Sequence, residues 1–228
     1  MKTIKEYCEK ARSLGACKQG ISKAAGMTVD EIIYRWPVWA VRVAACDMSR
    51  DQLMAAIQRD GHAIAYMSAE ERTEAVCLAA VGQCGEVIQY LTRKQQSGAV
   101  CRAAVRQCGD AIRHLSTKQQ SGAVCLAAVS QCGDAIRHLS TAQRSEAVCL
   151  AAVRQDGRAI CHLTVKQRSE AVCLAAVRQD GHAIACMSAE ERTEAICLAA
   201  VHRDSYAIEY LTLKQRTKAV RLAAGVRL

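Results

Sequence analysis

The chain has few aromatic residues and almost no proline. It contains no phenylalanine, one proline and two tryptophans in 228 residues, and its hydrophobic fraction of 51% is carried mainly by Ala, Val, Leu, Ile and Cys. The distance between packed helices depends on the side chains at the contact, and small side chains shorten it. The composition therefore excludes a large aromatic core and favours closely packed helices.

Long apolar segments are also missing. The repeated run AVCLAAV is far shorter than the roughly 20 residues that span a bilayer. The N-terminal sequence MKTIKEYCEK is charged and has no apolar signal core. We therefore expect a soluble protein with no membrane partner and no secretion signal of its own.

Catalytic and metal-binding signatures are absent from the sequence. It has no phosphate-binding glycine loop, no dinucleotide-binding fingerprint and no hydrolase serine motif. Cys108 with His114, or Cys132 with His138, are conceivable zinc ligands, but C-x-x-C pairs are missing and equivalent residues recur a whole repeat apart. We therefore expect no enzymatic activity, no metal and no cofactor.

What the chain does have is a repeat of 24 residues. It returns seven times in register from Ser49 to Arg216, and an eighth copy breaks off after TKAVRLAAGVRL. Such self-similarity predicts an all-α fold, a right-handed α-solenoid that alternates long helices with short α or 3₁₀ helices. Residues 1–48 are expected to form a helical N-terminal cap, and residues 49–228 the seven repeats and a C-terminal half repeat.

Each repeat carries start and stop signals for its helices. Ser68 and Glu71 form a capping box, which predicts a helix start, and the same Ser/Thr to Glu/Gln spacing recurs in every copy. A glycine such as Gly85 follows where a left-handed residue would end the helix. The pattern predicts a long helix over 69–83 and then a short helix. Ser205 replaces this glycine in the last full repeat, so we expect strain or a different turn there.

Six of the fourteen cysteines share one position in the long helix: Cys77, Cys101, Cys125, Cys149, Cys173 and Cys197. Neighbouring helices lie about 8 to 10 Å apart, whereas a disulfide needs Cα atoms within about 7 Å. Disulfides along this column are therefore not expected. We interpret these residues as small buried hydrophobic side chains of a protein in a reducing compartment, such as a cytoplasm.

The phrase AVCLAAVRQDGRAICHLTVKQRSEAV resembles a tandem repeat known only as a domain of unknown function, with an AV-K/R-Q-N/D-G core, then A-L-x-Y/H and a polar cap. The resemblance covers residues 49–228 and rests on Ala80, Val81, Gln83, Gly85 and their equivalents. Proteins with this repeat are frequent among secreted effectors of intracellular bacteria and in phage or giant-virus genomes. The resemblance implies an adaptor or inhibitor, in some cases delivered into a host cell. In its period the chain is also similar to the variant leucine-rich repeat, although it lacks that family's prolines. Neither family supplies catalytic residues.

One position of the short helix carries a ring-bearing polar side chain in nearly every repeat. These residues are Tyr66, Tyr90, His114, His138, His162 and Tyr210, and Cys186 is the exception. Such side chains suit a surface that recognises another protein. The alternative is that they fill space between neighbouring short helices. Asp110 and His114, like Asp134 and His138, are also spaced i, i+4, which favours structural pairing over catalysis.

A second variable position lies on the long helix and includes Arg106, Arg154 and Arg178. With Arg102, Arg113 and Arg137 these residues would form a basic stripe for phosphates or for carboxylates of a partner, and a solvated helix face is the alternative. The net charge is +9, and residues 97–168 hold ten Lys or Arg against four acidic residues. We expect a protein partner with an acidic surface, with nucleic acid as the alternative. The apolar end AVRLAAGVRL would allow a homodimer.

Overall fold

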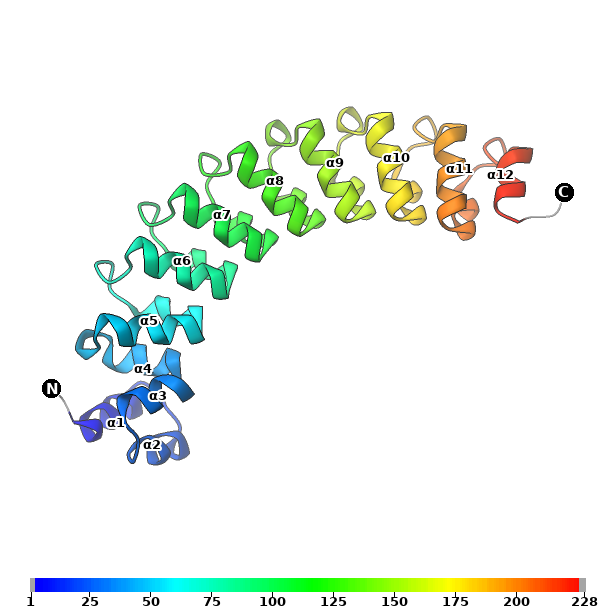
Figure 1. Ribbon diagram of the computed structural model, residues 1–228. Helices are drawn as coiled ribbons and strands as arrows, with labels where there is room; N and C mark the ends of the chain where they lie inside the picture. The colour runs from blue at the N-terminus through cyan, green and yellow to red at the C-terminus, as the bar shows by residue number, and fades with distance from the viewer. Residues whose placement is uncertain (1–2, 226–228) are drawn as a thin grey trace. The chain divides into compact units, whose positions relative to one another are not determined.

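The computed structural model of the chain describes residues 3–225, and this range contains helices and no strand. Contacts between Cα atoms divide the chain into two compact units, residues 1–107 and 108–228. Within each unit, long and short helices alternate along the chain (Figure 1). The predicted all-α repeat solenoid is therefore confirmed. None of the helices in residues 3–225 is long and apolar enough to cross a membrane.

The first unit begins with helices that are not copies of the repeat. These are α1 (Ile4–Ser13), α2 (Lys18–Ala24), α3 (Val29–Arg35), α4 (Pro37–Ala44) and the 3₁₀ helix η1 (Ala45–Asp47). Thr3 with Glu6 and Thr28 with Glu31 form complete capping boxes at the starts of α1 and α3. The repeats of this unit follow as α5 (Arg50–Arg59), η2 (Gly61–Tyr66), α6 (Glu74–Gln83), η3 (Gly85–Tyr90) and α7 (Gly98–Gln107).

The second unit consists of repeats only. Its long helices are α8 (Gly122–Gln131), α9 (Glu146–Gln155), α10 (Glu170–Gln179), α11 (Glu194–Arg203) and the shorter α12 (Lys218–Ala223). Its 3₁₀ helices are η4 (Gly109–His114), η5 (Gly133–His138), η6 (Thr141–Gln143), η7 (Gly157–His162), η8 (Val165–Gln167), η9 (Gly181–Cys186) and η10 (Ser205–Tyr210). Residues 226–228 of the segment expected to form a homodimer lie outside the described residues.

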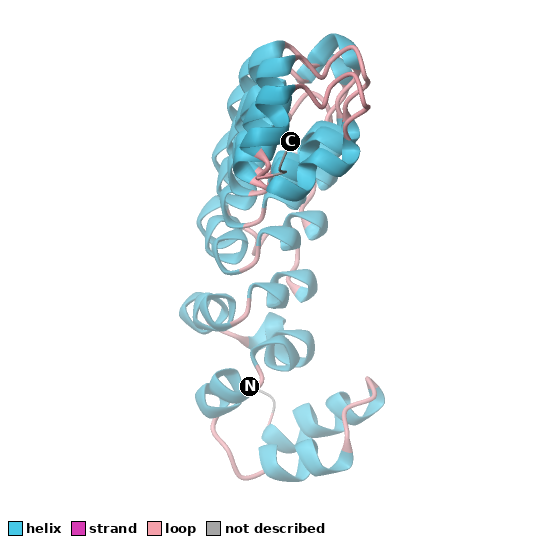
Figure 2. Ribbon diagram, turned by 90° about the vertical axis from the view of Figure 1, so that its right-hand side faces the viewer, coloured by secondary structure: helices cyan, strands magenta, loops and turns pink. Residues whose placement is uncertain are grey.

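Long and short helices of the second unit form two layers. The long helices α8 to α11 contact one another in chain order, and so do the six-residue 3₁₀ helices η4, η5, η7, η9 and η10 (Figure 2). In α9, for example, Val148, Cys149, Ala152 and Val153 are buried, and in η7 Ala159 and Ile160 are buried. The core therefore lies between the two layers and is built from small and medium aliphatic side chains.

The predicted start of the long helix is wrong by about one turn. The Ser68 and Glu71 hydrogen bonds of the capping box are present, but they hold a separate turn, and α6 begins only at Glu74. Thr73 is the N-cap of α6, and its hydroxyl accepts a hydrogen bond from the N–H of Val76. The equivalent Ser or Thr side chain caps α9 to α12 in the same way, whereas Ser121 at the N-cap of α8 makes no such hydrogen bond. The wrong start arises because Ser68 and Thr73 both cap a turn, and only Thr73 precedes the long helix.

The predicted role of the closing glycines is also wrong. Positive φ angles occur only at Gly15 and Gly225 among the described residues, so glycines such as Gly133 do not end the long helix in a left-handed conformation. A Cβ atom on Gly133 would instead lie 2.6 Å from the carbonyl oxygen of Ala152 in the next repeat. Glycine is needed there because two repeats approach closely. Ser205 is exposed and has no positive φ, so the expected strain is not found.

The column of six cysteines is buried, and all six are free thiols, as predicted. Each thiol donates a weak hydrogen bond to the backbone carbonyl five residues earlier, as Cys125 does to Gln120 at 3.4 Å. Burial raises the pKa of these thiols, and that of Cys173 to about 11. The thiol of Cys125 shares this carbonyl with the side-chain amide of Gln143, which also donates to it.

The structure differs from the expected reduced state at one pair of cysteines. Cys161 of η7 and Cys186 of η9 form a disulfide, with Cα atoms 5.2 Å apart. Neither residue belongs to the buried column. The bridge links two neighbouring short helices, whereas the prediction considered only the long helices.

Candidate partner-binding surface

The ring-bearing position is the last residue of each six-residue short helix. In η9 this position is occupied by Cys186, which has no ring. In the first unit the side chains of Tyr66 and Tyr90 are 43% and 40% exposed, and in the second unit that of Tyr210 is 42% exposed. His162 is also exposed, whereas His114 and His138 are half-buried. Each of these side chains is therefore partly accessible to solvent.

Histidines of this position contact a carboxylate of the preceding repeat. His138 lies 3.5 Å from the carboxylate of Asp110, and His162 lies 2.7 Å from that of Asp134. These pairs are separated by 28 residues, that is, by one repeat and one turn. The structure therefore supports the packing interpretation for His138 and His162, since each contact joins two short helices. The predicted i, i+4 pairing of Asp134 with His138 is not among the ion pairs of the described residues.

The environment of His138 favours its neutral form. Burial lowers the pKa of His138 first of all, Arg137 and Arg113 lower it further, and Asp110 and Asp134 act in the opposite direction. A neutral imidazole retains one donor and one acceptor nitrogen. The half-buried ring therefore provides a hydrogen-bonding edge without a charge.

The arginines of the predicted basic stripe fall into two groups. Arg102 and Arg106 lie on α7 of the first unit. In the second unit, Arg154 on α9 and Arg178 on α10 both occupy the repeat position of Arg106. All four are exposed, and none of them takes part in the hydrogen bonds or ion pairs found among residues 3–225. Their guanidinium groups are therefore available for a partner.

Arg113 and Arg137 are already engaged. Arg137 forms an ion pair of 2.6 Å with Asp134 and lies 3.9 Å from Asp110. The Nε of Arg113 donates to His114 at 3.1 Å, and Arg137 donates in the same way to His138. These two residues are exposed, but they hold the histidines and carboxylates of the short helices together.

A second set of arginines, which the basic stripe predicted from the sequence does not include, joins the repeats. Arg144 and Arg168 stand just before the N-cap of a long helix, and each donates to the backbone carbonyl of the ring-bearing position in the following repeat. At the same repeat position Gln120 is buried and donates to the carbonyls of Ile112 and Leu115. The signal in the sequence is that this position holds only Arg or Gln from residue 72 onward. Part of the basic excess in residues 97–168 is therefore structural.

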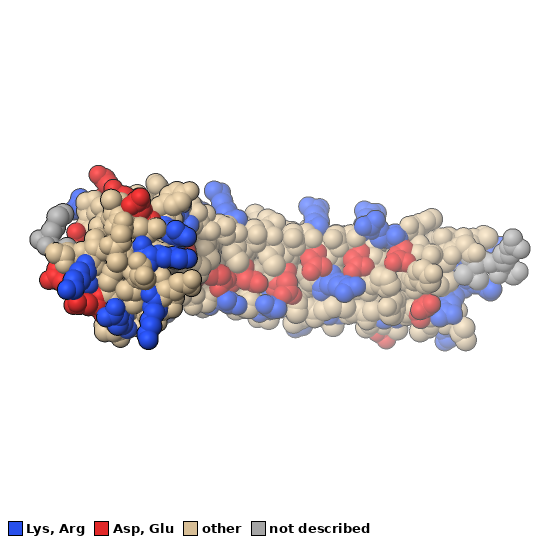
Figure 3. All heavy atoms as spheres, turned by 90° about the horizontal axis from the view of Figure 1, so that it is seen from below, with Lys and Arg blue, Asp and Glu red and all other residues tan. Residues whose placement is uncertain are grey.

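Charges of both signs mix on the surface. Acidic side chains lie among the basic ones over the face seen in Figure 3, and Arg158 pairs with Asp180 at 2.9 Å. In residues 3–225 there is no group of three or more His, Cys, Asp or Glu side chains that would hold a metal ion. Within each unit, the arrangement offers hydrogen bonds and separate positive charges on adjacent repeats.

Comparison of the chain with protein-family models, with curated proteins and with solved structures finds no match.

Proposed function

We propose that this protein is a non-enzymatic repeat scaffold that binds another protein. The binding surface would combine the exposed edges of the ring-bearing residues with the arginines of the long helices. Recognition by a repeat array of this kind uses exposed positions that vary while the buried frame stays constant.

One observation carries the proposal. Arg154 and Arg178 occupy equivalent exposed positions on adjacent helices without an intramolecular partner, whereas Arg137, Arg144 and Arg158 are engaged. Adjacent packed helices lie about 8 to 10 Å apart. A partner with carboxylates at that separation would pair with both guanidinium groups.

We further propose that the protein acts in a reducing compartment, either the cytoplasm of its own cell or that of a host into which it is delivered as an effector or phage-encoded adaptor or inhibitor. The twelve free cysteines support this proposal. The disulfide between Cys161 and Cys186 is the exception, because a reducing compartment disfavours such bonds.

Two multiple variants test the binding surface against an identified partner. Changing Arg154 and Arg178 to Glu is expected to weaken binding at least ~10-fold, since each charge reversal replaces an attraction by a repulsion. Changing Tyr90, His114, His138 and His162 to Ala tests the ring-bearing residues. A matched control changes Lys118 and Lys166, which lie outside both sets, to Glu. Equal loss in the control would point to net charge and contradict the assigned surface.

Nucleic-acid binding is the second candidate function, favoured by the net charge of +9 and the unpaired arginines. If it holds, affinity falls steeply as salt rises, because neutralised phosphates release counterions. Absence of binding to single- or double-stranded DNA and RNA at low salt would remove this candidate.

A further inference from the structure

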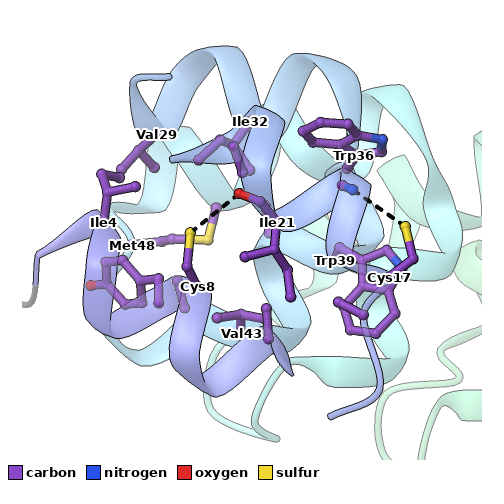
Figure 4. A pocket seen from close by; sticks show the side chains of 17 residues that line it. Ile4, Cys8, Cys17, Ile21, Val29, Ile32, Trp36, Trp39, Val43 and Met48 are labelled. Atoms are coloured by element: carbon purple, nitrogen blue, oxygen red, sulfur yellow. Dashed lines mark hydrogen bonds between the residues drawn. The ribbon is translucent and has the colours of Figure 1, made fainter. Parts of the chain in front are cut away.

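The helices before the repeats line a half-open apolar cavity. It lies within the first unit between α1, α2, α3 and α4 and has a volume of about 170 Å³. Side chains from all four helices point into it, among them Ile4, Ile21, Ile32, Trp36 and Trp39 (Figure 4). We propose that this cavity binds a small apolar molecule that carries one aromatic ring or a short alkyl chain.

Three polar groups of the cavity wall already have partners. The thiol of Cys8 donates to the carbonyl of Ile21 at 3.8 Å, and the sulfur of Cys17 accepts from the N–H of Gly20 at 3.3 Å. The hydroxyl of Tyr7 is hydrogen-bonded to Asp47, and burial together with Asp47 raises the pKa of Tyr7. An ordered water needs two to four polar partners. The wall therefore favours an apolar occupant over water.

The volume indicates the size of the ligand group that enters the cavity. An engineered cavity of about 150 Å³ lined by Leu, Ile and Phe stays dry and binds benzene. A cavity of about 170 Å³ accordingly accepts a single six-membered ring with a small substituent.

Both indole rings of the wall are held from outside the cavity. The guanidinium group of Arg35 lies 5.3 Å from the ring centre of Trp36, and that of Arg42 lies 4.8 Å from the ring of Trp39. Such cation–π contacts restrict the rings. The flat walls are therefore in place before a ligand arrives, which lowers the entropic cost of binding.

The site lies outside the repeats and shares no residue with the partner-binding surface. Binding of the small molecule is therefore measured without a protein partner. Trp36 and Trp39 are also the only tryptophans of the chain. Tryptophan fluorescence thus reports on this cavity alone.

The experiment titrates the full chain with iodobenzene, an apolar ring whose heavy atom quenches tryptophan fluorescence. We expect saturable quenching with a dissociation constant on the order of 1 mM or tighter, and a melting temperature that rises with iodobenzene concentration. Iodide ion measures the quenching that solvent exposure alone produces. Linear quenching without saturation, equal to that by iodide, would overturn the proposal.

The last residue of α2, Ala24, and its C-cap, Ala25, provide a matched pair of variants. Ala24 lines the cavity, whereas Ala25 is exposed and does not. Ala24→Leu is expected to weaken iodobenzene binding at least ~10-fold, and Ala25→Leu to leave it unchanged. If circular dichroism shows that Ala24→Leu does not fold, Ala11→Leu fills the cavity from α1. Equal affinity in the filled variant and in Ala25→Leu contradicts the site.

Discussion

The side-chain oxygen of Gln155 accepts a hydrogen bond of 2.6 Å from the backbone N–H of Gly133, one repeat earlier. The amide nitrogen of the same side chain donates to the carbonyl of Gln131 at 3.4 Å. Gln131 and Gln179 make the corresponding contacts to Gly109 and Gly157. In each of these three repeats a single glutamine thus satisfies backbone groups at the end of the preceding long helix.

Removing this contact should loosen the second unit. Gln155→Ala leaves the buried N–H of Gly133 without its partner, so we expect the free energy of unfolding to fall by about 1–3 kcal/mol. Chemical denaturation followed by circular dichroism measures the change. The control is Arg154→Ala at the exposed neighbouring position, which should stay within about 0.5 kcal/mol of the wild type. A similar loss in both variants would show that the glutamine contact is unimportant.

The glycine that receives this contact should not tolerate a side chain. Gly133→Ala places a methyl group 2.6 Å from the carbonyl oxygen of Ala152, so we expect a loss of about 1–3 kcal/mol. Gly122, the first residue of α8, has open space at the Cβ position. Gly122→Ala should therefore stabilise the chain by about 0.4–1 kcal/mol. Thermal or chemical unfolding should show changes of opposite sign in the free energy of unfolding of the two variants. Destabilisation by both variants would contradict this expectation.

Stability should decrease in mildly acidic solution because of His138. Its pKa in the folded chain lies below the usual value of about 6.5, so the unfolded chain binds a proton more readily. The contribution of His138 to the free energy of unfolding is complete well above pH 6.5, and it is lost as the pH falls through and below that value. His138→Gln, which cannot be protonated, should show a smaller decrease between about pH 7.5 and 5.5. Identical pH profiles of the two proteins would contradict the lowered pKa.

The bridge between Cys161 and Cys186 should be visible in a thiol count. Under denaturing conditions the oxidised protein should show 12 reactive thiols, and the reduced protein all 14. Cys161→Ser should lower the stability of the oxidised protein by about 3 kcal/mol and leave that of the reduced protein nearly unchanged. Cys132→Ser, which removes a free thiol of the same unit, is the control. A count of 14 in protein purified without reductant would exclude the disulfide.

The sequence predicts the architecture well because the period, the capping residues and the apolar positions all repeat together. It fails at details that depend on contacts between repeats. The start of α6 at Glu74 is decided by the second of two capping residues, and Gly133 is needed for a close approach that a single repeat does not contain. The contact between Asp134 and His162, which lie 28 residues apart, also becomes apparent only when repeats are stacked.

The candidate surface is less predictable than the fold. Sequence reasoning finds the exposed Arg154 and Arg178, yet it does not separate them from Arg144 and Arg168, which donate to backbone carbonyls. Charge counting treats all four alike. Only the packing of neighbouring repeats decides which guanidinium groups remain available.

The most direct test of the proposed function is an affinity capture with the full chain from bacterial and host-cell lysates, with and without nuclease. It is run beside the variant in which Arg154 and Arg178 are changed to Glu. We predict that the wild-type chain retains a discrete protein after nuclease treatment and that the variant loses it. Recovery that disappears with nuclease, or a captured protein that the variant retains equally, would contradict a protein-binding scaffold that uses this surface.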